Sequence, residues 1–409
     1  MSLIVDHRQR SAEQWLRLAT PAIARILDRA LADETLSEDE GEALFGADGD
    51  DLGALLAAAD TVRRRRVGDD VSFVVCRNIN FTNICYMGCK FCGFAKRRDD
   101  PGAELLSLDE VARRAVEAHD RGATEVCIQG GLHPKIDAGH YRRIVEAVIA
   151  AVPAMHIHAF SPFEIWYGAA KAGVPAAAFI AELKAAGLGS MPGTAAEILD
   201  TEVRRRLTRD KLTADEWVAI IRAAHSVAMP TTATIMYGHI DGPRHWARHI
   251  GLIRAIQRET GGFTEFVPLG FIHYDSPLYL NEPGVRPGPT AAEHVRMHAV
   301  ARLMLAGAID NIQASWVKLG PDFAQAMLDC GVNDLGGTLM NESISRAAGA
   351  RHGQEVTPAE MVAIIRGAGR RPVRRTTLYE TAETYDDHDP PAQAPLVPRT
   401  AADAAGRHG

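Results

Sequence analysis

The run Asn83-Ile84-Cys85-Tyr86-Met87-Gly88-Cys89-Lys90-Phe91-Cys92 places three cysteines close together in the chain. Three thiolates can bind three irons of a four-iron cluster. A cluster that only carries electrons normally has four protein ligands, so three cysteines leave one iron open to an exchangeable ligand. The run therefore predicts a [4Fe–4S] cluster held by Cys85, Cys89 and Cys92, with one iron available for chemistry.

Two simpler interpretations are a zinc knuckle and three unrelated thiols. Zinc usually takes four protein ligands in two pairs, and no second Cys or His pair stands at such a spacing here. The Cys-x3-Cys-x2-Cys spacing, with Phe91 before the last cysteine, is similar to the signature of radical S-adenosylmethionine (SAM) enzymes. That resemblance implies that the open iron chelates SAM. An electron from the cluster then breaks the sulfonium bond to give a 5′-deoxyadenosyl radical.

The remaining cysteines, Cys76, Cys127 and Cys330, lie apart in apolar segments and are expected to be buried thiols. No secretory signal precedes them, and their spacing does not suggest disulfides. No apolar run approaches the length of a membrane span. An oxygen-sensitive cluster also suits a reducing compartment, so the sequence predicts a soluble cytoplasmic protein.

The charge of the chain gives little reason to expect a polyanionic partner. The formal net charge is −7. The basic run Arg63 to Arg66 is interpreted as the positive end of a helix, where cations suit the helix dipole. Nucleic-acid binding is therefore not expected.

The sequence divides into three regions. The 409 residues, 46% of them hydrophobic, are enough to bury one large core. Residues 1–70 have helical periodicity without strand candidates and are expected to form a helical N-terminal cap. Residues 71–370 alternate short apolar runs with amphipathic stretches, as expected of a parallel sheet wrapped by helices. Residues 371–409 form a C-terminal extension that is expected to be largely disordered after about 386.

Eight candidate strands in the second region predict an α/β fold, a closed (β/α)8 barrel of the TIM type. They are Phe73–Asn80, Glu125–Gln129, His156–Phe160, Gly187–Met191, Thr231–Tyr237, Glu265–Leu269, Asn311–Trp316 and Asp334–Gly336. Helix starts are predicted by capping boxes at Ser37, Ser107, Thr213, Thr290 and Thr357, each with a Glu three residues later.

The active sites of such barrels lie at the carboxyl ends of the strands, so polar residues that follow strands are the functional candidates. The cysteine loop follows the first strand. Gly130 and Gly131 follow the second, where they would let the backbone approach the amino end of SAM, although a plain turn is the other interpretation.

Carboxylates and hydroxyls follow the next two strands. Ser161 and Glu164 follow the third strand, and Glu197 follows the fourth. A carboxylate there could bind the SAM amino group or ribose, while helix capping and a solvated Glu are the structural alternatives. Lys211 could pair with the SAM carboxylate, or it could be a surface lysine.

The later strand ends carry aromatic, imidazole and amide groups that would suit a planar polar substrate. The candidates for substrate binding or proton transfer are His239, His273 and Asn333, with Trp316 nearby. For each histidine a structural role is an equal alternative.

Five segments also resemble a known family, the tyrosine-using half of FO synthase, called subunit 2 or CofH. They are Cys76–Phe94, His156–Pro162, Pro192–Glu197, Met236–His239 and Asn333–Thr338, and the likeness runs from about residue 30 to 380. It implies that a 5′-deoxyadenosyl radical takes hydrogen from L-tyrosine, whose Cα–Cβ bond then breaks. The 4-hydroxybenzyl group adds to 5-amino-6-(D-ribitylamino)uracil on the route to coenzyme F420. The resemblance also implies an external electron donor and a ring-closing partner, FO synthase subunit 1 of the CofG type.

Carried over to this sequence, the resemblance makes Cys85, Cys89 and Cys92 the cluster ligands and places Phe91 near the adenine. Gly130, Gly131, Glu197 and Lys211 would hold SAM, with Ser161 a further candidate, and the region of His239, His273, Trp316 and Asn333 would face the substrates. Three positions depart from the family pattern: Cys76 replaces an Asn, Gly93 an Ala and Gly270 a Pro.

Several alternatives remain open. Radical SAM enzymes of menaquinone (futalosine) biosynthesis share the Arg77-Asn78-Ile79-Asn80 lead and the cysteine spacing. The His158-Ala159-Phe160-Ser161-Pro162 segment favours FO synthase over them. A CofH-like paralogue with another acceptor is a second alternative. A non-enzyme, either a SAM sensor or an electron-transfer Fe–S protein, is a third.

Overall fold

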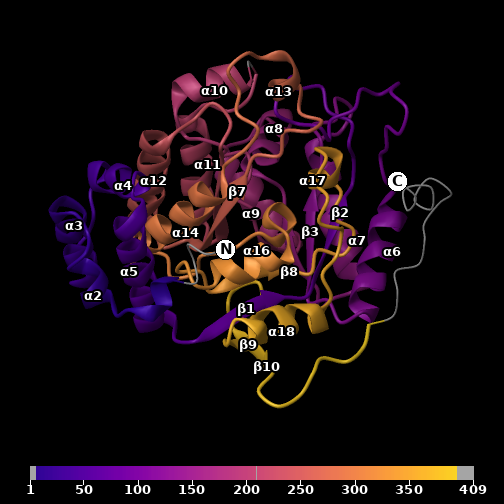
Figure 1. Cartoon of the computed structure of the whole chain (residues 1–409). Helices are drawn as coiled ribbons and strands as arrows, with labels where there is room; N and C mark the ends of the chain where they lie inside the picture. The colour runs from indigo at the N-terminus through magenta and orange to yellow at the C-terminus, as the bar shows by residue number, and fades with distance from the viewer. Residues whose placement is uncertain (1–5, 209, 394–409) are drawn as a thin grey trace.

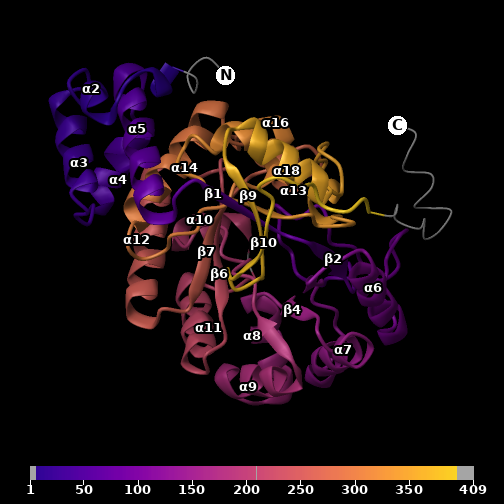
Figure 2. The same cartoon turned by 90° about the horizontal axis from the view of Figure 1, so that it is seen from below.

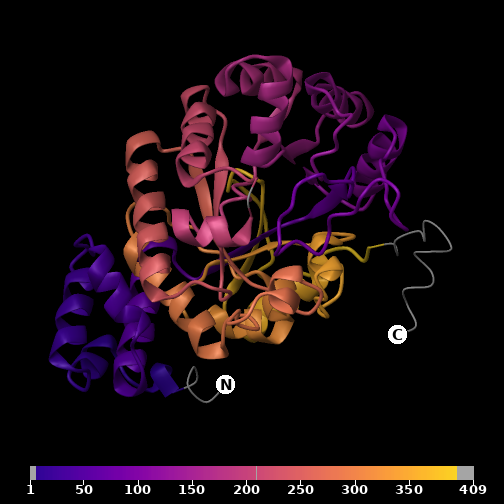
Figure 3. The same ribbon diagram turned by 90° about the horizontal axis from the view of Figure 1, so that it is seen from above.

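The computed structural model describes residues 6–208 and 210–393. A ring of parallel strands lies at the centre with helices around it (Figure 3). The described strands, of which β9 and β10 lie outside this ring, are β1 Asp70–Val74, β2 Cys76–Asn80, β3 Glu125–Gln129, β4 His156–Ala159, β5 Leu188–Ser190, β6 Thr231–Tyr237, β7 Phe263–Gly270, β8 Asp334–Gly337, β9 Arg371–Arg375 and β10 Thr381–Thr384.

Strand pairing closes the ring. Parallel pairs join β2 to β3, β3 to β4, β4 to β5 and β6 to β7, and the bridge Met191–Thr231 links β5 to β6. Bridges at Ile312 and Gln313 connect β7 to β8, and Arg77–Met340 connects β8 to β2. The predicted (β/α)8 barrel is therefore confirmed.

Helices surround the barrel because their apolar faces pack on the strands. They are α6 Leu108–Asp120, α7 Ala138–Ala151, α8 Pro162–Ala172, α9 Ala176–Ala186, α10 Thr201–Leu207, α11 Ala214–Ser226, α12 Pro243–Thr260, α13 Pro277–Asn281, α14 Ala291–Leu305, α15 Trp316–Leu319, α16 Pro321–Met327, α17 Ile344–Ala347 and α18 Pro358–Gly367. The predicted boxes at Ser37, Thr213, Thr290 and Thr357 form with both hydrogen bonds. Ser107 caps α6, but Glu110 bonds to Arg113 and Arg114 instead of closing the box.

Helices from the N-terminal part of the chain pack beside α12 and α14 (Figure 1). They are η1 Asp6–Gln9, α2 Ala12–Leu16, α3 Pro21–Leu31, α4 Glu38–Phe45 and α5 Gly49–Val67. Arg254 of α12 links the N-terminal part of the chain to α14. Its Nη1 donates to the carbonyl of Leu36 at 2.7 Å and to that of Met304 in α14 at 3.0 Å. The predicted basic helix end is confirmed in α5, although its Arg63 is buried.

The β9–β10 hairpin lies across the amino end of the barrel (Figure 2). β9 pairs with β1, and β10 pairs antiparallel with β9. The connecting turn inserts polar groups among the strands: Thr377 Oγ1 donates to Glu125 at 2.7 Å, and Tyr379 Oη donates to Glu265 at 2.5 Å. Arg375 binds Asp334 through Nε at 2.6 Å and Nη2 at 3.1 Å. This end of the barrel is therefore filled by polar side chains.

Three sequence-based predictions differ from the structure. The single strand predicted for 73–80 is interrupted at Val75, because β1 pairs with β8 and β9 while β2 pairs with β3. The strand predicted for 311–316 is reduced to bridges at Ile312 and Gln313, and Trp316 begins α15. The extension beyond residue 370 contains β9 and β10, which the sequence did not predict. Of the tail expected to be disordered, 394–409 lie outside the described residues.

Candidate active site

The cysteine loop leaves the carboxyl end of β2 and is anchored by backbone hydrogen bonds. The Cys85 N–H donates to Lys96 at 3.0 Å, and the Lys90 N–H donates to Leu207 at 3.0 Å, which ties the loop to α10. The Cys92 N–H donates to the Cys89 carbonyl at 3.2 Å. These bonds hold the three thiols at the rim of the barrel rather than on a free loop.

The three thiols line one cavity of about 180 Å³, together with Phe91 and Lys211. All three are free and partly buried. Burial raises the pKa of Cys89 to about 11 and also raises the pKa of Cys92, while the Lys211 ammonium partly offsets both effects. A buried thiolate needs a positive partner, and iron supplies one.

This donor set fits an iron–sulfur cluster better than a single ion. Across residues 6–208 and 210–393, no three His, Cys, Asp or Glu side chains come close enough to hold one metal ion. In a cluster each thiolate binds a different iron, so three spaced thiols around one cavity are what such a site requires. The lining of this cavity contains no fourth cysteine and no histidine among the residues that the structure describes.

Gly130 and Gly131 follow β3 and line the same cavity. A Cβ on Gly131 would lie 2.5 Å from the Ile84 carbonyl oxygen and 2.9 Å from Cys85 Cβ, so this position fits only glycine without movement of the cysteine loop. The Gly130 N–H donates to Glu164 at 3.0 Å and the Gly131 N–H donates to Thr82 at 2.8 Å. Their N–H groups are used within the protein, which leaves their carbonyls as the groups suited to a ligand ammonium.

Ser161 and Glu164 form the capping box that starts α8. Glu164 accepts from the Ser161 N–H at 2.8 Å, from Ser161 Oγ at 2.7 Å and from Gly130. Burial raises the pKa of the Glu164 carboxyl to about 7, against the lowering effect of these hydrogen bonds. The pair therefore fixes the glycine turn, and both residues also line the cavity.

Glu197 and Lys211 bind each other, with Lys211 Nζ 2.6 Å from Glu197 Oε1. Glu197 has a left-handed backbone, with φ of 40°, and lies 3.6 Å from Arg204 Nη1. Lys211 Nζ lies 4.7 Å from the centre of the Phe91 ring. Glu197, Lys211 and Phe91 therefore meet beside the cysteines, as a SAM site at this position would require. Lys211 is largely buried and is not a surface lysine.

A second cavity of about 170 Å³ adjoins the first, and Phe91, Cys92 and Phe94 line both. Its walls are mostly apolar, with Met236, Leu269, Gly270, Phe271, Ile272 and Ile344. Lys318 is its one lining cation among the described residues. Lys318 Nζ donates to Ser345 Oγ at 2.7 Å. Burial lowers its pKa, and the charge of Glu342 partly offsets that effect.

The residues expected to face substrate are placed differently. Neither His239 nor His273 lines either cavity as described. His239 is fully buried: its Nδ1 accepts from the Ile240 N–H at 2.8 Å, so Nε2 donates to the Met236 carbonyl at 3.0 Å. This geometry favours a structural role. His273 packs against Tyr274 in a tilted contact and against Tyr279 edge-on, with ring centres 4.1 and 4.7 Å away.

Asn333 and Trp316 are also held by internal hydrogen bonds. Asn333 precedes β8 and so lies at the amino end of the barrel, opposite the cysteine loop, instead of at the rim. Its Oδ1 accepts from Arg302 at 2.7 Å and from the Ile312 N–H at 2.9 Å. Trp316 is buried, and its Nε1 donates to Gly337 at 2.8 Å. Proton-transfer roles for His239, His273 and Asn333 remain predictions.

Among the cavity residues to which sequence reasoning gave no role are Lys318 and Gln129. Gln129 ends β3, and its Oε1 accepts from Thr194 Oγ1 at 2.8 Å, which joins two strand ends across the cavity. Its position just before the glycine pair was a usable signal. Lys318 had no such signal, because its burial depends on how α15 packs.

Of the thiols expected to be buried, Cys76 and Cys330 are, while Cys127 is only partly buried.

A barrel that carries three free cysteines after β2, around one cavity at its rim, has the arrangement of a radical SAM enzyme. The Radical SAM superfamily model matches residues 79–253, and the model of the CofH/MqnC C-terminal region matches residues 260–388. Members of this class use a [4Fe–4S] cluster and SAM.

Relatives narrow the class to one family. The 5-amino-6-(D-ribitylamino)uracil–L-tyrosine 4-hydroxyphenyl transferase of Methanopyrus kandleri is 53% identical over 348 residues, which cover 85% of this chain and 94% of that protein. The FO synthase of Mycobacterium leprae is 53% identical over 363 residues, which cover 89% of this chain and 42% of that protein. The chain thus spans about two-fifths of the FO synthases it matches. It belongs to the CofH family of radical SAM enzymes.

Solved structures agree on the fold alone. Methylornithine synthase (PylB) is similar with a TM-score of 0.67 and 18% identity, covering 85% of this chain and 97% of that one. The maturase HydG from Carboxydothermus hydrogenoformans is similar with a TM-score of 0.68 and 16% identity, covering 92% and 86% of the two chains.

Proposed function

We propose that this chain cleaves the Cα–Cβ bond of L-tyrosine, releases the amino-acid remainder as a two-carbon imino acid, and transfers the 4-hydroxybenzyl group to 5-amino-6-(D-ribitylamino)uracil. This is a step in the synthesis of FO for coenzyme F420. The observation that carries this proposal is the match to the Methanopyrus kandleri transferase along 94% of its length. The family model covers both CofH and MqnC, and the names of the relatives favour the CofH activity.

The cofactors would occupy the first cavity. Cys85, Cys89 and Cys92 would hold the cluster, and Lys211 and the glycine carbonyls would meet the carboxylate and ammonium of SAM. When bound and reduced, the cluster would supply the electron that cleaves SAM into methionine and a 5′-deoxyadenosyl radical. Glu197 lies within reach of Lys211 and would set the position of its ammonium.

The second cavity would hold tyrosine. Phe91, Leu269 and Phe271 offer apolar surface to the phenol ring. Lys318 is buried without a carboxylate within ion-pair distance among the described residues, so a substrate carboxylate would be a favourable partner. The shared wall of Phe91 and Cys92 places this cavity beside the first one, where hydrogen abstraction from tyrosine would begin.

We further propose that FO synthase subunit 1, a CofG-type radical SAM protein, closes the ring, and that an external donor reduces the cluster. The FO synthase relatives are more than twice as long as their matched part, which leaves room for a second activity. No described helix is long and apolar enough to cross a membrane. An oxygen-sensitive cluster favours a reducing cytoplasm.

The test is anaerobic reconstitution with iron and sulfide, followed by reductant and SAM with or without L-tyrosine. The proposal expects 5′-deoxyadenosine release that tyrosine stimulates, together with loss of tyrosine. Equal release of 5′-deoxyadenosine with and without tyrosine would contradict tyrosine as the substrate. No release at all would favour a SAM sensor or an electron-transfer protein.

A further inference from the structure

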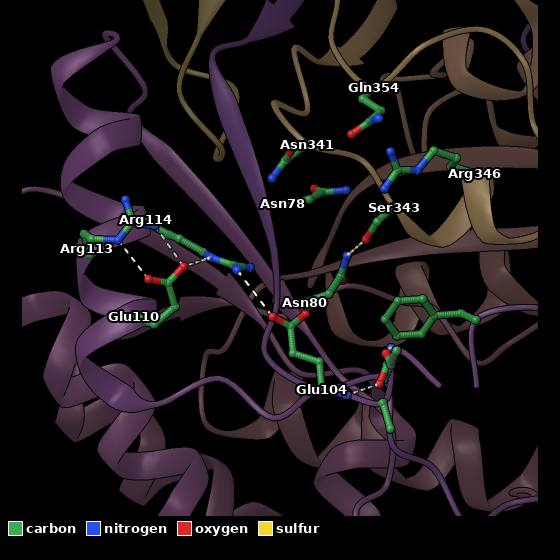
Figure 4. A pocket seen from close by; sticks show the side chains of 14 residues that line it. Asn78, Asn80, Glu104, Glu110, Arg113, Arg114, Asn341, Ser343, Arg346 and Gln354 are labelled. Carbon is green, nitrogen blue, oxygen red and sulfur yellow. Dashed lines mark hydrogen bonds and ion pairs between the residues drawn. The ribbon is translucent and has the colours of Figure 1, made fainter. Parts of the chain in front are cut away.

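A large polar cavity of about 570 Å³ lies next to the two barrel cavities. Its walls come from α6, from β2 and from the segment 341–354 (Figure 4). Asn78 and Asn80 of β2 lie between the α6 side chains and a second group that includes Asn341 and Gln354. The family resemblance assigned this space no role.

The cavity has unused hydrogen-bonding capacity. Asn78 Oδ1 is buried and has no partner. The side chains of Asn341 and Gln354 form no hydrogen bond within residues 6–208 and 210–393, whereas Asn80 Nδ2 donates to Ser343 Oγ at 2.6 Å. Each amide offers both donors and acceptors. A ligand that also alternates donors and acceptors would satisfy them, as a row of hydroxyl groups does.

The charges of the cavity argue against an anion. Glu110 binds Arg113 at 2.8 and 2.9 Å and Arg114 at 2.6 Å, and Glu104 lies 3.7 Å from Arg114. These carboxylates neutralise both guanidinium groups and would repel a phosphate. Arg346 is exposed and is the one lining cation without a carboxylate partner in the described part of the chain. A neutral polar ligand suits this balance better than a charged one.

Phe94 connects this cavity with the chemistry, because it lines all three cavities. Ser343 lines the polar cavity, and its neighbour Ile344 lines both barrel cavities. A ligand in the polar cavity can therefore present one end to the wall formed by Phe94 and Ile344. Beyond that wall lies the space assigned to tyrosine.

We propose that the polar cavity binds the polyhydroxylated chain of the acceptor, the ribityl group, with the uracil ring directed toward Phe94. This inference rests on the proposed function and adds a location for the acceptor to it. Asn78, Asn341 and Gln354 would bind hydroxyl groups, and the apolar second cavity would stay free for tyrosine. The ribityl chain would then make the acceptor distinguishable from a bare diaminouracil.

The test compares two acceptors, 5-amino-6-(D-ribitylamino)uracil and 5,6-diaminouracil, with the reconstituted full chain. The wild type should show a clearly lower KM for the ribityl compound. Asn78→Ala and Gln354→Ala should each raise that KM about fivefold, as expected for one lost hydrogen bond, and leave the KM for 5,6-diaminouracil unchanged. Tyrosine-stimulated 5′-deoxyadenosine release should be retained. Gln354→Ala carries the test alone if Asn78→Ala does not fold, since the Gln354 side chain makes no internal bond.

The matched control is Asn281→Ala, an exposed amide on α13 that does not line the cavity; its KM values should equal those of the wild type. Equal effects of the variants on both acceptors would overturn the inference. Competition by inorganic phosphate would also overturn it, because it would identify an anion site. Failure of the wild type to use either acceptor would refute the proposed function itself, a result distinct from loss of ribityl preference.

Discussion

Glu164 shows how one buried carboxyl supports the site. It accepts three hydrogen bonds at the glycine turn, yet burial raises its pKa from 4.5 to about 7. A raised pKa means that the folded state holds the proton more tightly than the unfolded state. The resulting stabilisation is complete below pH 4.5 and is lost as the pH rises to about 7.

We predict that wild type loses up to about 3 kcal/mol of stability relative to Glu164→Gln between pH 4.5 and 7. The difference is measured by denaturant unfolding of the cluster-free protein at a series of pH values. Glu182→Gln, at a site 49% exposed, is the control for the loss of a carboxylate at the surface. A constant difference for Glu164→Gln would show that its carboxyl is not perturbed.

Lys318 is the residue on which the proposed binding of tyrosine in the second cavity most depends. Replacing it with Met keeps the apolar stem and removes the charge. We predict a rise of about 10- to 100-fold in the KM for tyrosine, the range for loss of one charge-assisted hydrogen bond. Tyramine, which lacks the carboxylate, should stimulate 5′-deoxyadenosine release equally in both proteins.

The control is Lys184→Met on the exposed face of α9, which should leave the KM for tyrosine unchanged. SAM affinity should be the same in all three proteins. An unchanged tyrosine KM in Lys318→Met would show that the carboxylate is bound elsewhere.

At the scale of elements, the cysteine loop and the turn after β3 must fit each other closely. A Cβ at Gly131 would meet backbone at 2.5 Å, whereas a Cβ at Gly88, within the loop itself, would meet nothing within 4 Å. We predict that Gly131→Ala loses most of its cluster and that Gly88→Ala keeps it. Iron content and the visible absorbance of the reconstituted proteins measure this difference. Equal iron in both variants would show that the loop adjusts freely.

The β9–β10 hairpin is the second element with a clear test. Arg375 is buried against Asp334, while Arg371 of the same strand is 50% exposed and pairs with Asp70. Loss of one partner leaves the other buried and unpaired, so Arg375→Met should cost about 3–5 kcal/mol. Arg371→Met should cost at most about 1 kcal/mol. Both are measured by urea unfolding, and similar costs would contradict a structural role for the buried pair.

The elements differ in how well sequence predicts them. β3 and β6 have the predicted bounds, because their apolar, β-branched runs are local signals. The strand predicted from Asn311 shrinks to two bridges, since its pairing depends on β7 and β8. β9 reads Arg-Pro-Val-Arg-Arg, which looks like a charged tail until the fold supplies Asp334 as a partner.

The residues of the site also differ in how well the sequence predicts them. Cysteine spacing is a local signal, so the three thiols were predictable, and the glycine pair followed from its place after a strand. Lys318 follows a helix start that the sequence did not indicate, and its burial is a tertiary property. Asn333 was predicted at the rim although it precedes the strand predicted for 334–336, and a residue that precedes a barrel strand lies at the amino end of the barrel.

At the scale of the whole molecule, the two ends of the barrel differ in the groups that occupy them. The hairpin fills the amino end with paired polar groups, while the cysteine loop and three cavities occupy the carboxyl end. The α2–α5 helices pack beside α12 and α14, away from the loop (Figure 1). The thiols, the apolar cavity and the polar cavity therefore share one side of the barrel.

The most direct test of the account uses the reconstituted full chain with reductant, SAM, ring-labelled L-tyrosine and 5-amino-6-(D-ribitylamino)uracil. Mass spectrometry should detect a uracil product that carries the labelled 4-hydroxybenzyl group, and Cys89→Ala should give neither this product nor 5′-deoxyadenosine. Release of 5′-deoxyadenosine by wild type without any labelled adduct would contradict the transferase assignment. Retention of 5′-deoxyadenosine release in Cys89→Ala would contradict the cluster site itself.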